Sequence, residues 1–276
     1  MKRLQDKVCV VTGAAGVLCS IFSEALLEEG AKVALLDLDG ERVGKLADAL
    51  AEKGYTETVP IKSNVLERAS LEAAKQQILS KWGKIDILLN GAGGNHPKGT
   101  CPLEQLTDGD DPKQSFFGLD IDGFKQVNEL NFIGTLIPTQ VFCEAMLDKG
   151  GSVINVSSMS STQPMTKVAA YSAAKAAIDN FTRWLAVHLA PKNIRVNAIA
   201  PGFFSTEQNK FLLFEADGKT MTPRGQKILD NTPMHRFGDP KELTGALKFL
   251  CSEEEASFVT GTIIPIDGGF MAYSGV

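Results

Sequence analysis

Short apolar runs alternate along the chain with longer stretches in which apolar residues recur at helical spacing. We predict seven strands, at residues 7–12, 32–36, 57–61, 85–89, 152–156, 194–199 and 262–266. The clearest helical patterns lie between them, at 17–29, 41–53 and 67–82. The strands are almost continuously apolar, as expected when helices cover both faces of a parallel sheet. The pattern therefore predicts an α/β fold with a doubly wound, parallel, seven-stranded sheet and helices on both faces.

The length of the chain suits one unit of this kind. It has 276 residues, of which 43% are hydrophobic, and no linker or repeat interrupts the pattern. We therefore expect a single domain over residues 1–276. Two long stretches without regular periodicity lie near residues 94–120 and 203–236. Irregular segments of that length in a compact domain are usually functional, and we expect both to contribute to substrate binding.

Composition narrows the class of protein. The net charge is -5 and no cluster of Lys and Arg occurs, which argues against a nucleic-acid partner. No apolar stretch approaches the ~20 residues that span a bilayer, so we expect no membrane segment. The five cysteines lie far apart and are odd in number, which is typical of the reducing cytoplasm. Three dispersed histidines have no metal-ligand spacing, and we predict no metal site.

The first predicted strand is followed by a turn of small residues and a helix. Gly13 and Gly16 lie in this turn, where small residues let the backbone approach a pyrophosphate and the helix offers free N–H groups to the anion. Asp37 ends the second strand, about 20 residues further on, where a carboxylate accepts hydrogen bonds from the adenosine ribose. Asp37 has the alternative role of capping a surface turn. Together these features predict a Rossmann-type dinucleotide site, with NAD preferred over NADP because Asp37 repels a 2′-phosphate.

Tyr171 and Lys175 stand four positions apart in a further helical pattern, so both side chains lie on one helix face. An isolated phenol titrates at about pH 10, and a nearby ammonium favours its ionised form, which eases proton exchange. An alcohol must lose a proton when its hydride leaves for a nicotinamide. The same spacing is also common on structural helices. Ser157 and Ser158 follow the fifth predicted strand and strengthen the catalytic interpretation, because the carboxyl ends of parallel strands meet at one crevice.

In order and spacing, these motifs resemble the short-chain dehydrogenase/reductase family over essentially the whole chain. The matching positions are Thr12, Gly13, Asp37, Asn90, Gly91, Ala92, Gly93, Asn131, Ser158, Tyr171, Lys175, Pro201, Gly202, Asp267, Gly268 and Gly269. The resemblance implies a catalytic tetrad of Asn131, Ser158, Tyr171 and Lys175. Ser158 would hold the substrate oxygen and Tyr171 would exchange the proton; Ser157 is the competing serine. Lys175 would bind the nicotinamide ribose and lower the pKa of the tyrosine, and Asn131 would hold a relay water.

The resemblance also implies a set of cofactor contacts. They are Thr12, Gly13, Gly16, Val17, Leu18, Asp37, Leu38, Asn64, Val65, Asn90, Gly91, Ala92, Tyr171, Lys175, Pro201, Gly202 and Thr206. Two departures from the family pattern bear on them. Val17 and Cys19 replace glycines of the turn, and Asn64 replaces an aspartate beside the adenine. These changes bear on the affinity for the cofactor more than on its identity.

Polar residues after the fourth strand and before Tyr171 are candidate substrate contacts. The candidates are Asn95, His96, Lys98, Ser158, Gln163 and Arg224. His96 could equally cap a turn, and Lys98 or Arg224 could be a solvated surface charge. This polar, cation-bearing set fits a hydroxylated anion better than an apolar substrate. The Gly-Gly-Asn-His-Pro-Lys run and the Val-Leu-Cys departure resemble the fructuronate reductase (D-mannonate oxidoreductase) branch of the family. We therefore expect reversible reduction of a small polyhydroxylated keto acid, D-fructuronate to D-mannonate, with NADH.

Other functions stay open at this point. Gluconate 5-dehydrogenase and 3-oxoacyl carrier reductase belong to the same family, although the latter normally prefers NADP and a basic docking surface. A non-catalytic NAD-sensing scaffold is an alternative of a different class, because fold does not imply function; a scaffold would not need the four tetrad residues. The resemblance also implies a homotetramer with the long tetrad helices and the C-terminal segment at its interfaces. Trp82 and Trp184 are expected to be packing residues.

Overall fold

The computed structural model describes residues 2–206, 213–218 and 220–275, and within them seven strands form one parallel sheet. The strands are β1 (Val8–Thr12), β2 (Lys32–Asp37), β3 (Thr58–Lys62), β4 (Ile87–Asn90), β5 (Gly151–Val156), β6 (Ile194–Pro201) and β7 (Ile263–Ile266). Each corresponds to a predicted strand, with its ends displaced by at most two residues. The predicted fold class is confirmed.

The order of the strands determines where a ligand can bind. They lie in the order β3-β2-β1-β4-β5-β6-β7, so the direction of the crossovers reverses between β1 and β4. These two strands pair in parallel, with Thr12 opposite Asn90. In open parallel sheets, ligands bind beyond the carboxyl ends of the strands at such a reversal. The fold therefore places the expected site beyond Thr12 and Asn90.

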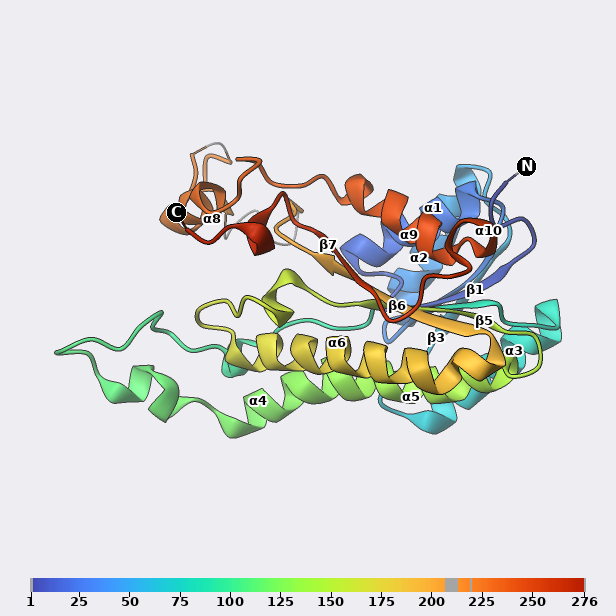
Figure 1. Ribbon diagram of the computed structural model, residues 1–276, viewed down its shortest axis with the longest axis horizontal. Helices are drawn as coiled ribbons and strands as arrows, with labels where there is room; N and C mark the ends of the chain where they lie inside the picture. Colours follow the sequence, from blue (N-terminus) through green and yellow to red (C-terminus); the bar gives the residue numbers. More distant parts are fainter. Residues whose placement is uncertain (1, 207–212, 219, 276) are drawn as a thin grey trace.

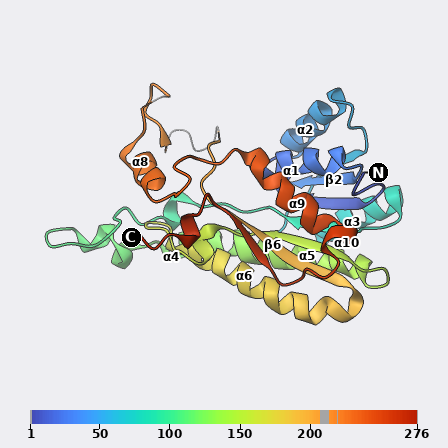
Figure 2. The ribbon, with the colours of Figure 1, turned by 45° about the horizontal axis from the view of Figure 1, so that its top comes forward.

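Helices cover both faces of the sheet (Figure 1). One face carries α1 (Val17–Glu28), α2 (Gly40–Glu52) and α9 (Thr244–Cys251). The other carries α3 (Arg68–Trp82), α5 (Gly134–Cys143) and α6 (Ala169–Leu189), with α4 (Ile121–Asn128) packed against α6. The short α10 (Glu253–Ala256) follows α9, and α8 (Pro223–Asp230) stands apart from these layers (Figure 2).

The two helical layers explain why the strands lack polar alternation. In β1, Cys9 and Val11 pack into the core beneath α1 and α9, whereas Val8 and Val10 pack into the core beneath α3 and α5. All four side chains are fully buried. Successive side chains of a strand point to opposite faces, so a strand between two helical layers needs apolar residues at every position.

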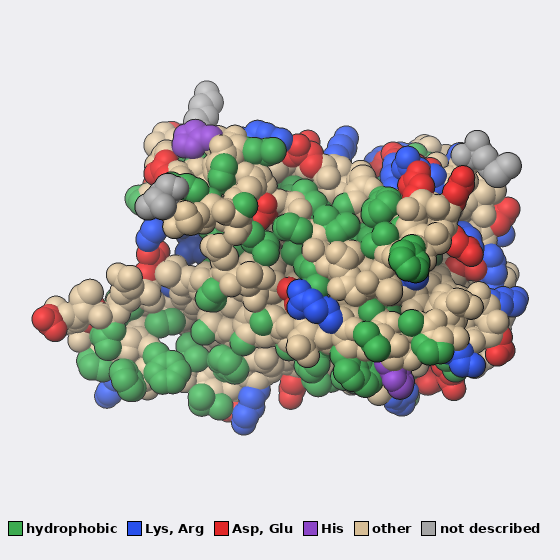
Figure 3. Space-filling view, viewed as in Figure 1, with side chains coloured by type: hydrophobic (Ala, Val, Ile, Leu, Met, Phe, Trp, Pro, Cys, Tyr) green, Lys and Arg blue, Asp and Glu red, His purple; other side chains and the backbone are tan. Residues whose placement is uncertain are grey.

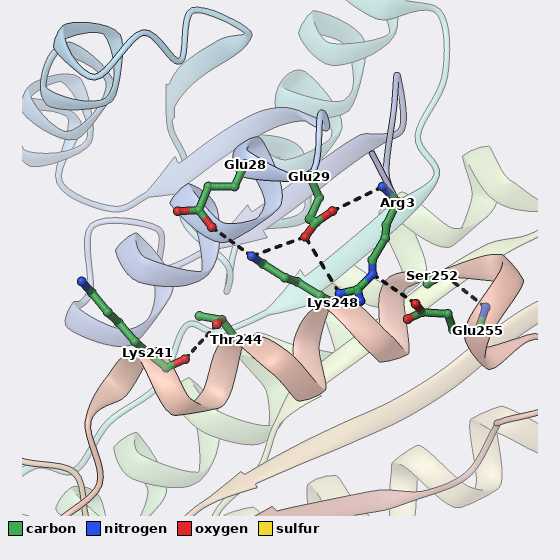
Figure 4. A network of polar contacts seen from close by, with 8 residues as sticks. All are labelled: Arg3, Glu28, Glu29, Lys241, Thr244, Lys248, Ser252 and Glu255. Atoms are coloured by element: carbon green, nitrogen blue, oxygen red, sulfur yellow. Dashed lines mark hydrogen bonds and ion pairs between the residues drawn. The ribbon is translucent and has the colours of Figure 1, made fainter. Parts of the chain in front are cut away.

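Ion pairs fasten the end of α1 to α9 and to the N-terminus (Figure 4). Lys248 on α9 pairs with Glu28 at 2.9 Å and with Glu29 at 3.5 Å. Arg3 pairs with Glu255 of α10 at 3.1 Å, and its backbone N–H donates to Glu29. Because α1 runs back from the carboxyl end of β1, this network lies at the opposite edge of the sheet from the expected site. The network therefore stabilises the packing of α1 against α9 and takes no part in the candidate site.

The two irregular stretches take different forms. Residues 94–120 form an arm that projects beyond the sheet, at the left of Figure 1, built from 3₁₀ turns at Pro97–Gly99, Pro112–Gln114 and Phe116–Gly118. Hydrophobic side chains gather on its surface (Figure 3). The second stretch, 203–236, contains the helix α8; its residues 207–212 and 219 lie outside the described residues.

The tryptophans divide between core and surface. Trp82 packs against the core beneath α3, as predicted. The prediction for Trp184 is wrong, because its side chain lies on the outer face of α6 and is 58% exposed. It stacks on His188, with ring centroids 4.9 Å apart. Trp184 precedes the buried Leu185, and adjacent helical positions point in different directions, so composition alone could not assign its face.

Among the described helices, none has both the length and the apolar character needed to cross a membrane.

Candidate active site

The turn after β1 brings two backbone segments into close contact. Gly13 has a φ of +65°, and a Cβ built on it would lie 2.8 Å from the Cα of Ala92. The hydroxyl of Thr12 accepts hydrogen bonds from the backbone nitrogens of Gly91 (3.1 Å) and Ala92 (3.3 Å). Thr12 therefore joins the two turns that follow β1 and β4. Only glycine fits at position 13, because the space and the backbone conformation both exclude a side chain.

The first helix begins with unsatisfied donors. Gly16 is the N-cap of α1, no side chain caps the helix, and its first turn carries no acidic residue. The first N–H groups of an uncapped helix are free to bind an anion, and the helix dipole favours negative charge there. Val17 and Leu18 begin the helix and so contribute backbone donors at this end. The predicted pyrophosphate position therefore has the donors that such a group requires.

Asp37 is held at the end of β2 by the same turn. One carboxylate oxygen accepts a hydrogen bond from the backbone nitrogen of Ala15 at 3.0 Å, and the other accepts from Asp39 at 3.1 Å. Arg42 on α2 donates to the carbonyl oxygen of Ala15 at 2.9 Å. The carboxylate of Asp37 thus binds the backbone nitrogen of Ala15, and the guanidinium of Arg42 binds its carbonyl oxygen, beside the predicted ribose site. Arg42 could not be identified from local spacing, because its contact with Ala15 spans 27 positions.

Cys19 occupies the space that the family glycines leave open. A Cβ built on Gly91 would lie only 2.1 Å from the Sγ of Cys19, so the thiol packs directly against the turn after β4. Burial raises the pKa of this thiol to about 12, and it stays protonated and unreactive. The departure at position 19 is therefore accommodated by a glycine opposite it.

The other predicted cofactor residues fall into three groups. The Asn90 amide donates to Thr139 on α5 and to Asn155 on β5, both at 2.9 Å, and so links β4 to both elements.

The remaining positions lie nearer the edge of the sheet. Asn64 accepts from the backbone of Leu66 and donates to Glu67, and Val65 beside it is buried. Positions at the open edge are the exposed Leu38, Pro201 at the end of β6, Gly202 and Thr206.

Gly202 is required by a close approach of β6 and β7. Its backbone nitrogen donates to Ile266 at 2.9 Å, and a Cβ on it would lie 2.6 Å from the Cα of Asp267. The chain therefore passes directly beside the Asp-Gly-Gly turn after β7.

The structure separates the two candidate serines. Ser158 lies beside the phenol of Tyr171, and its hydroxyl lowers the pKa of that phenol. The hydroxyl of Ser157 instead donates to the carboxylate of Asp179 on α6. Ser158 also accepts hydrogen bonds from the backbone nitrogen of Ser160 at 3.2 Å and from its hydroxyl at 3.0 Å. Two consecutive residues at a strand end point in opposite directions, and only Ser158 faces the tyrosine.

Lys175 lies beneath the same tyrosine. Its Nζ is 5.4 Å from the centroid of the Tyr171 ring and donates a hydrogen bond of 2.7 Å to the carbonyl oxygen of Val156. A Cβ on Gly93 would lie 3.6 Å from this nitrogen. The helix spacing thus brings both side chains to the crevice beyond β4 and β5.

The electrostatics differ from the expectation that the lysine lowers the pKa of the tyrosine. Burial raises the pKa of Tyr171 above its ordinary value, and the neighbouring hydroxyl of Ser158 partly opposes this effect. Burial also lowers the pKa of Lys175 to about 8, an effect that the negative charge of Asp179 opposes. The shielding of both groups from water outweighs their mutual influence, which the sequence spacing could not reveal.

Asn131 lies at a break in the α-helical hydrogen-bond pattern. It is in a π-helical turn, Glu129–Ile133, between α4 and α5; such turns are frequent at functional sites. Its amide donates to the carbonyl oxygens of Gly94 (2.7 Å) and Val127 (2.8 Å) and accepts from the nitrogen of Gly94 (3.1 Å). Both amide protons are therefore engaged, one with the base of the arm at Gly94 and the other with α4 at Val127, and the helical pattern of the sequence did not indicate this arrangement.

The predicted substrate residues are already engaged in local contacts. The ring nitrogen Nδ1 of His96 accepts from the backbone of Lys98 at 3.2 Å, so His96 caps a turn. Asn95 donates to Thr100 at 2.9 Å, and Gln163 donates to the carbonyl oxygen of Met271 at 3.0 Å. Lys98 is exposed. These contacts shape the rim of the crevice, and direct binding by the same side chains would require them to be exchanged.

Two charged residues near Arg224, Glu104 and Lys227, were not identified from the sequence. Lys227 on α8 donates to Glu104 on the arm at 2.6 Å, and Lys167 and Arg224 also lower the pKa of Glu104. The pair is separated by 123 positions, so no local spacing could have indicated it. Among the described residues, no group of three or more His, Cys, Asp or Glu has metal-binding geometry.

Known proteins resemble the chain over nearly its full length. A family model described as enoyl-(acyl carrier protein) reductase matches residues 13–271. An uncharacterized oxidoreductase of Haemophilus influenzae is 49% identical over 99% of this chain and 96% of its own. The uncharacterized oxidoreductase UxuB of Bacillus subtilis is 48% identical over 100% of this chain and 98% of its own.

A solved structure agrees in fold as well as in sequence. It is a Haemophilus influenzae protein with bound NAD, described as a candidate D-mannonate oxidoreductase. It superposes with a TM-score of 0.94 at 48% identity, over 99% of this chain and 98% of that chain. Together with the turn after β1 and the Ser158, Tyr171 and Lys175 cluster, these matches show that the chain belongs to the short-chain dehydrogenase/reductase family of oxidoreductases.

Proposed function

We propose that the chain is an NAD(H)-dependent dehydrogenase that interconverts a small polyhydroxylated keto acid and its hydroxy acid, D-fructuronate and D-mannonate. The observation that carries the reaction type is a cluster of three side chains: Ser158 lies beside the phenol of Tyr171 and lowers its pKa, and the ammonium of Lys175 lies 5.4 Å from the centroid of the ring. Two adjacent hydroxyl groups at the carboxyl edge of the sheet are suited to hold and protonate a carbonyl oxygen.

The residues around the turn after β1 fit a dinucleotide. The uncapped end of α1 suits the pyrophosphate, the close contact of Gly13 with Ala92 keeps side chains out of the crevice, and Asp37 presents a fixed carboxylate to the ribose. A carboxylate at this position disfavours a 2′-phosphate, which supports NAD over NADP. The bound NAD in the related Haemophilus influenzae structure supports the same preference.

When it is bound, the nicotinamide supplies the hydride for reduction and accepts it in the reverse direction. Ser158 holds the substrate oxygen, and Tyr171 donates its phenolic proton to that oxygen or takes it back. Lys175 uses one of its three donors on Val156, which leaves two for the ribose hydroxyls. Both side-chain amide protons of Asn131 are engaged in hydrogen bonds. Asn131 therefore contacts a water of the proton relay through an oxygen atom, as an acceptor.

The substrate class rests on the polar character of the crevice rim. We infer that Lys98, Arg224 and Gln163 supply cations and an amide to this rim, beside Asn95 and His96, which are held by local hydrogen bonds. A hydroxylated acid complements such groups, whereas a steroid or acyl chain requires an apolar lining. The name of the related Haemophilus influenzae protein supports a sugar acid.

The experiment that tests this function is a matrix of substrates and cofactors. D-Fructuronate, 5-ketogluconate and an acetoacetyl thioester are each offered with NADH and with NADPH, and the absorbance of the reduced nicotinamide is followed. We expect the highest kcat/KM with D-fructuronate and NADH. Turnover of the thioester alone would overturn the proposal in favour of acyl reduction. Tight NAD binding without turnover of any substrate would indicate a non-catalytic protein.

Assembly and location stay predictions of the family resemblance. We expect a homotetramer in the cytoplasm, with α4, α5 and α6 at subunit interfaces. The exposed Trp184 and Val187 on α6 support this expectation, because large exposed apolar side chains often mark an interface.

A further inference from the structure

An ion pair joins the two irregular stretches of the chain. Lys227 on α8 donates a hydrogen bond of 2.6 Å to Glu104 on the arm. Figure 3 shows acidic and basic side chains meeting between α8 and the arm. Both partners are partly exposed, with side-chain exposures of 65% and 35%. Exposed ion pairs are weak because water competes for both charges, so this one can be exchanged for another partner.

The arm side of this pair is connected to the catalytic cluster through the backbone. Gly94 exchanges two hydrogen bonds with Asn131. Further along, the nitrogen of Cys101 donates to the carbonyl oxygen of Lys167 at 2.7 Å, and Lys167 stands four positions before Tyr171. Glu104 follows Cys101 by three positions. The arm that carries Glu104 is therefore hydrogen-bonded to the segment that leads into Tyr171.

Lys167 has an unusual backbone conformation. Its φ is +70°, a region that lysine rarely adopts because its Cβ crowds the backbone. Residues in such conformations cluster at functional sites, where the surrounding structure holds them. Here the hydrogen bond from Cys101 provides part of that restraint.

More positive charge surrounds Glu104 than one carboxylate balances. Lys227, Lys167 and Arg224 each lower the pKa of Glu104, with the hydrogen bond from Lys227 as the largest cause. Within residues 2–206, 213–218 and 220–275, Lys167 and Arg224 form no ion pair with an acidic side chain. Lys227 contacts Glu104 directly, Arg224 lies one helical turn before Lys227 on α8, and the backbone of Lys167 is hydrogen-bonded to the arm at Cys101, so three cations lie around a single acid of the chain itself.

We propose that Lys167, Arg224 and Lys227 form a carboxylate-binding subsite, and that Glu104 occupies this subsite until the carboxylate of the substrate displaces it. The inference rests on the proposed function, since it assigns the acid group of the keto acid to these three cations. An internal carboxylate in the subsite also excludes neutral substrates, because an uncharged group gains too little from the cations to displace Glu104.

Two substitutions in one ion pair should have opposite effects under this proposal. Lys227→Gln removes a cation from the subsite, and we expect it to weaken binding of a carboxylate ligand about tenfold. Glu104→Gln removes the internal competitor, and we expect it to strengthen binding of the same ligand several-fold. If the pair only held the arm against α8, both substitutions would loosen the same contact and would change affinity in the same direction.

The measurement is a calorimetric titration of D-mannonate into the NAD-saturated protein. All proteins carry Tyr171→Phe, so that no turnover accompanies binding. Lys45→Gln serves as the matched control, since Lys45 forms an exposed ion pair with Glu41 on α2. We expect no change in D-mannonate affinity for the control, and unchanged NAD affinity for every variant. D-Mannitol, which carries a hydroxymethyl group in place of the carboxylate, should bind more weakly and should not respond to Lys227→Gln.

The outcomes separate this inference from the proposed function. Equal affinities in all variants, shifts of the same sign at both positions, or no binding of D-mannonate would overturn the subsite. Opposite shifts combined with failure to reduce D-fructuronate in the substrate matrix would retain the subsite and overturn the assigned substrate. Circular dichroism of each variant establishes that it is folded, and an arginine at position 227 (Lys227→Arg) should restore affinity because it restores the charge.

Discussion

Lys175 donates a hydrogen bond to the main-chain oxygen of Val156, 2.7 Å away, at the carboxyl end of β5. This bond holds a buried ammonium beneath the ring of Tyr171 and leaves it two further donors. The strand end therefore positions the lysine, and the lysine and Ser158 together define the surroundings of the tyrosine.

Replacing Tyr171 by phenylalanine should lower kcat by roughly 10²–10⁴-fold, the usual contribution of a positioned acid or base. The ring remains to pack against Ser158 and Lys175, so the free energy of unfolding and the affinity for NADH should change little. Steady-state assays and NADH fluorescence titrations measure the two effects. Tyr273→Phe is the control and should retain full activity. A Tyr171→Phe protein with near-normal kcat would exclude this residue as the proton donor.

Lys175 should make stability depend on pH. Its pKa is about 8 in the folded chain against an ordinary value of 10.5, so between these pH values the unfolded chain binds more protons. The free energy of unfolding should therefore rise with pH across this window because of this group. Below pH 8 the penalty of the buried charge is fully present, at most about 3 kcal/mol; above pH 10.5 it is absent.

Urea unfolding of the wild type and of Lys175→Met at several pH values tests this dependence. The difference between the two free energies should change across the window from pH 8 to 10.5, while Lys45→Met, which removes an exposed lysine, should show no such change. A constant difference between wild type and Lys175→Met would mean that the lysine keeps its ordinary pKa in the folded protein.

Asp37 and Arg42 should together determine the choice of cofactor. We expect Asp37→Ala to raise KM for NADH about tenfold and to increase turnover with NADPH, because the carboxylate no longer repels a 2′-phosphate and Arg42 remains beside it. The double variant Asp37→Ala/Arg42→Ala should lose this gain with NADPH. Kinetics with both cofactors measure the effect, and Asp48→Asn on the exposed face of α2 is the control. Unchanged discrimination in Asp37→Ala would place the ribose elsewhere.

Two glycine substitutions should have opposite effects on stability. Gly13→Ala should destabilise the fold by roughly 2 kcal/mol or more, since its φ is +65° and the new Cβ would lie 2.8 Å from the Cα of Ala92. Gly44→Ala should stabilise it by about 0.5–1 kcal/mol, because nothing lies within 4 Å of the new Cβ and alanine favours a helix. Thermal or urea unfolding compares both with wild type, and equal effects would contradict the packing of the turn.

Val187→Glu should disrupt assembly without unfolding the subunit. Val187 is 78% exposed on α6 beside Trp184, and a charge at an apolar interface is costly to bury. Size-exclusion chromatography with light scattering should show a smaller species for this variant than for wild type. Lys192→Glu, which introduces the same charge just beyond the end of α6, is the control. A wild-type protein that is already monomeric would overturn the predicted homotetramer.

The fold could be predicted because its signals are local. A strand between two helical layers buries every side chain, as Val8, Cys9, Val10 and Val11 do, and this requirement leaves an uninterrupted apolar run in the sequence. The turn after β1 was also predictable, since Gly13 and Asp37 stand at fixed distances within one strand-turn-helix-strand unit. The ends of the strands were displaced by at most two residues, because backbone pairing and not composition defines them.

Spacing along one helix or strand indicates which residues share a face, and the amino-acid sequence was sufficient to place Tyr171 with Lys175 and to bring both to the crevice. Packing between distant segments decided the other features of the site. Ser158 lies beside Tyr171, whereas Ser157 binds Asp179. Burial, and not the neighbouring lysine, dominates the pKa of Tyr171, and Lys227 contacts Glu104 across 123 positions. Shielding from water and contacts across the chain arise only when the elements assemble, so no local pattern records them.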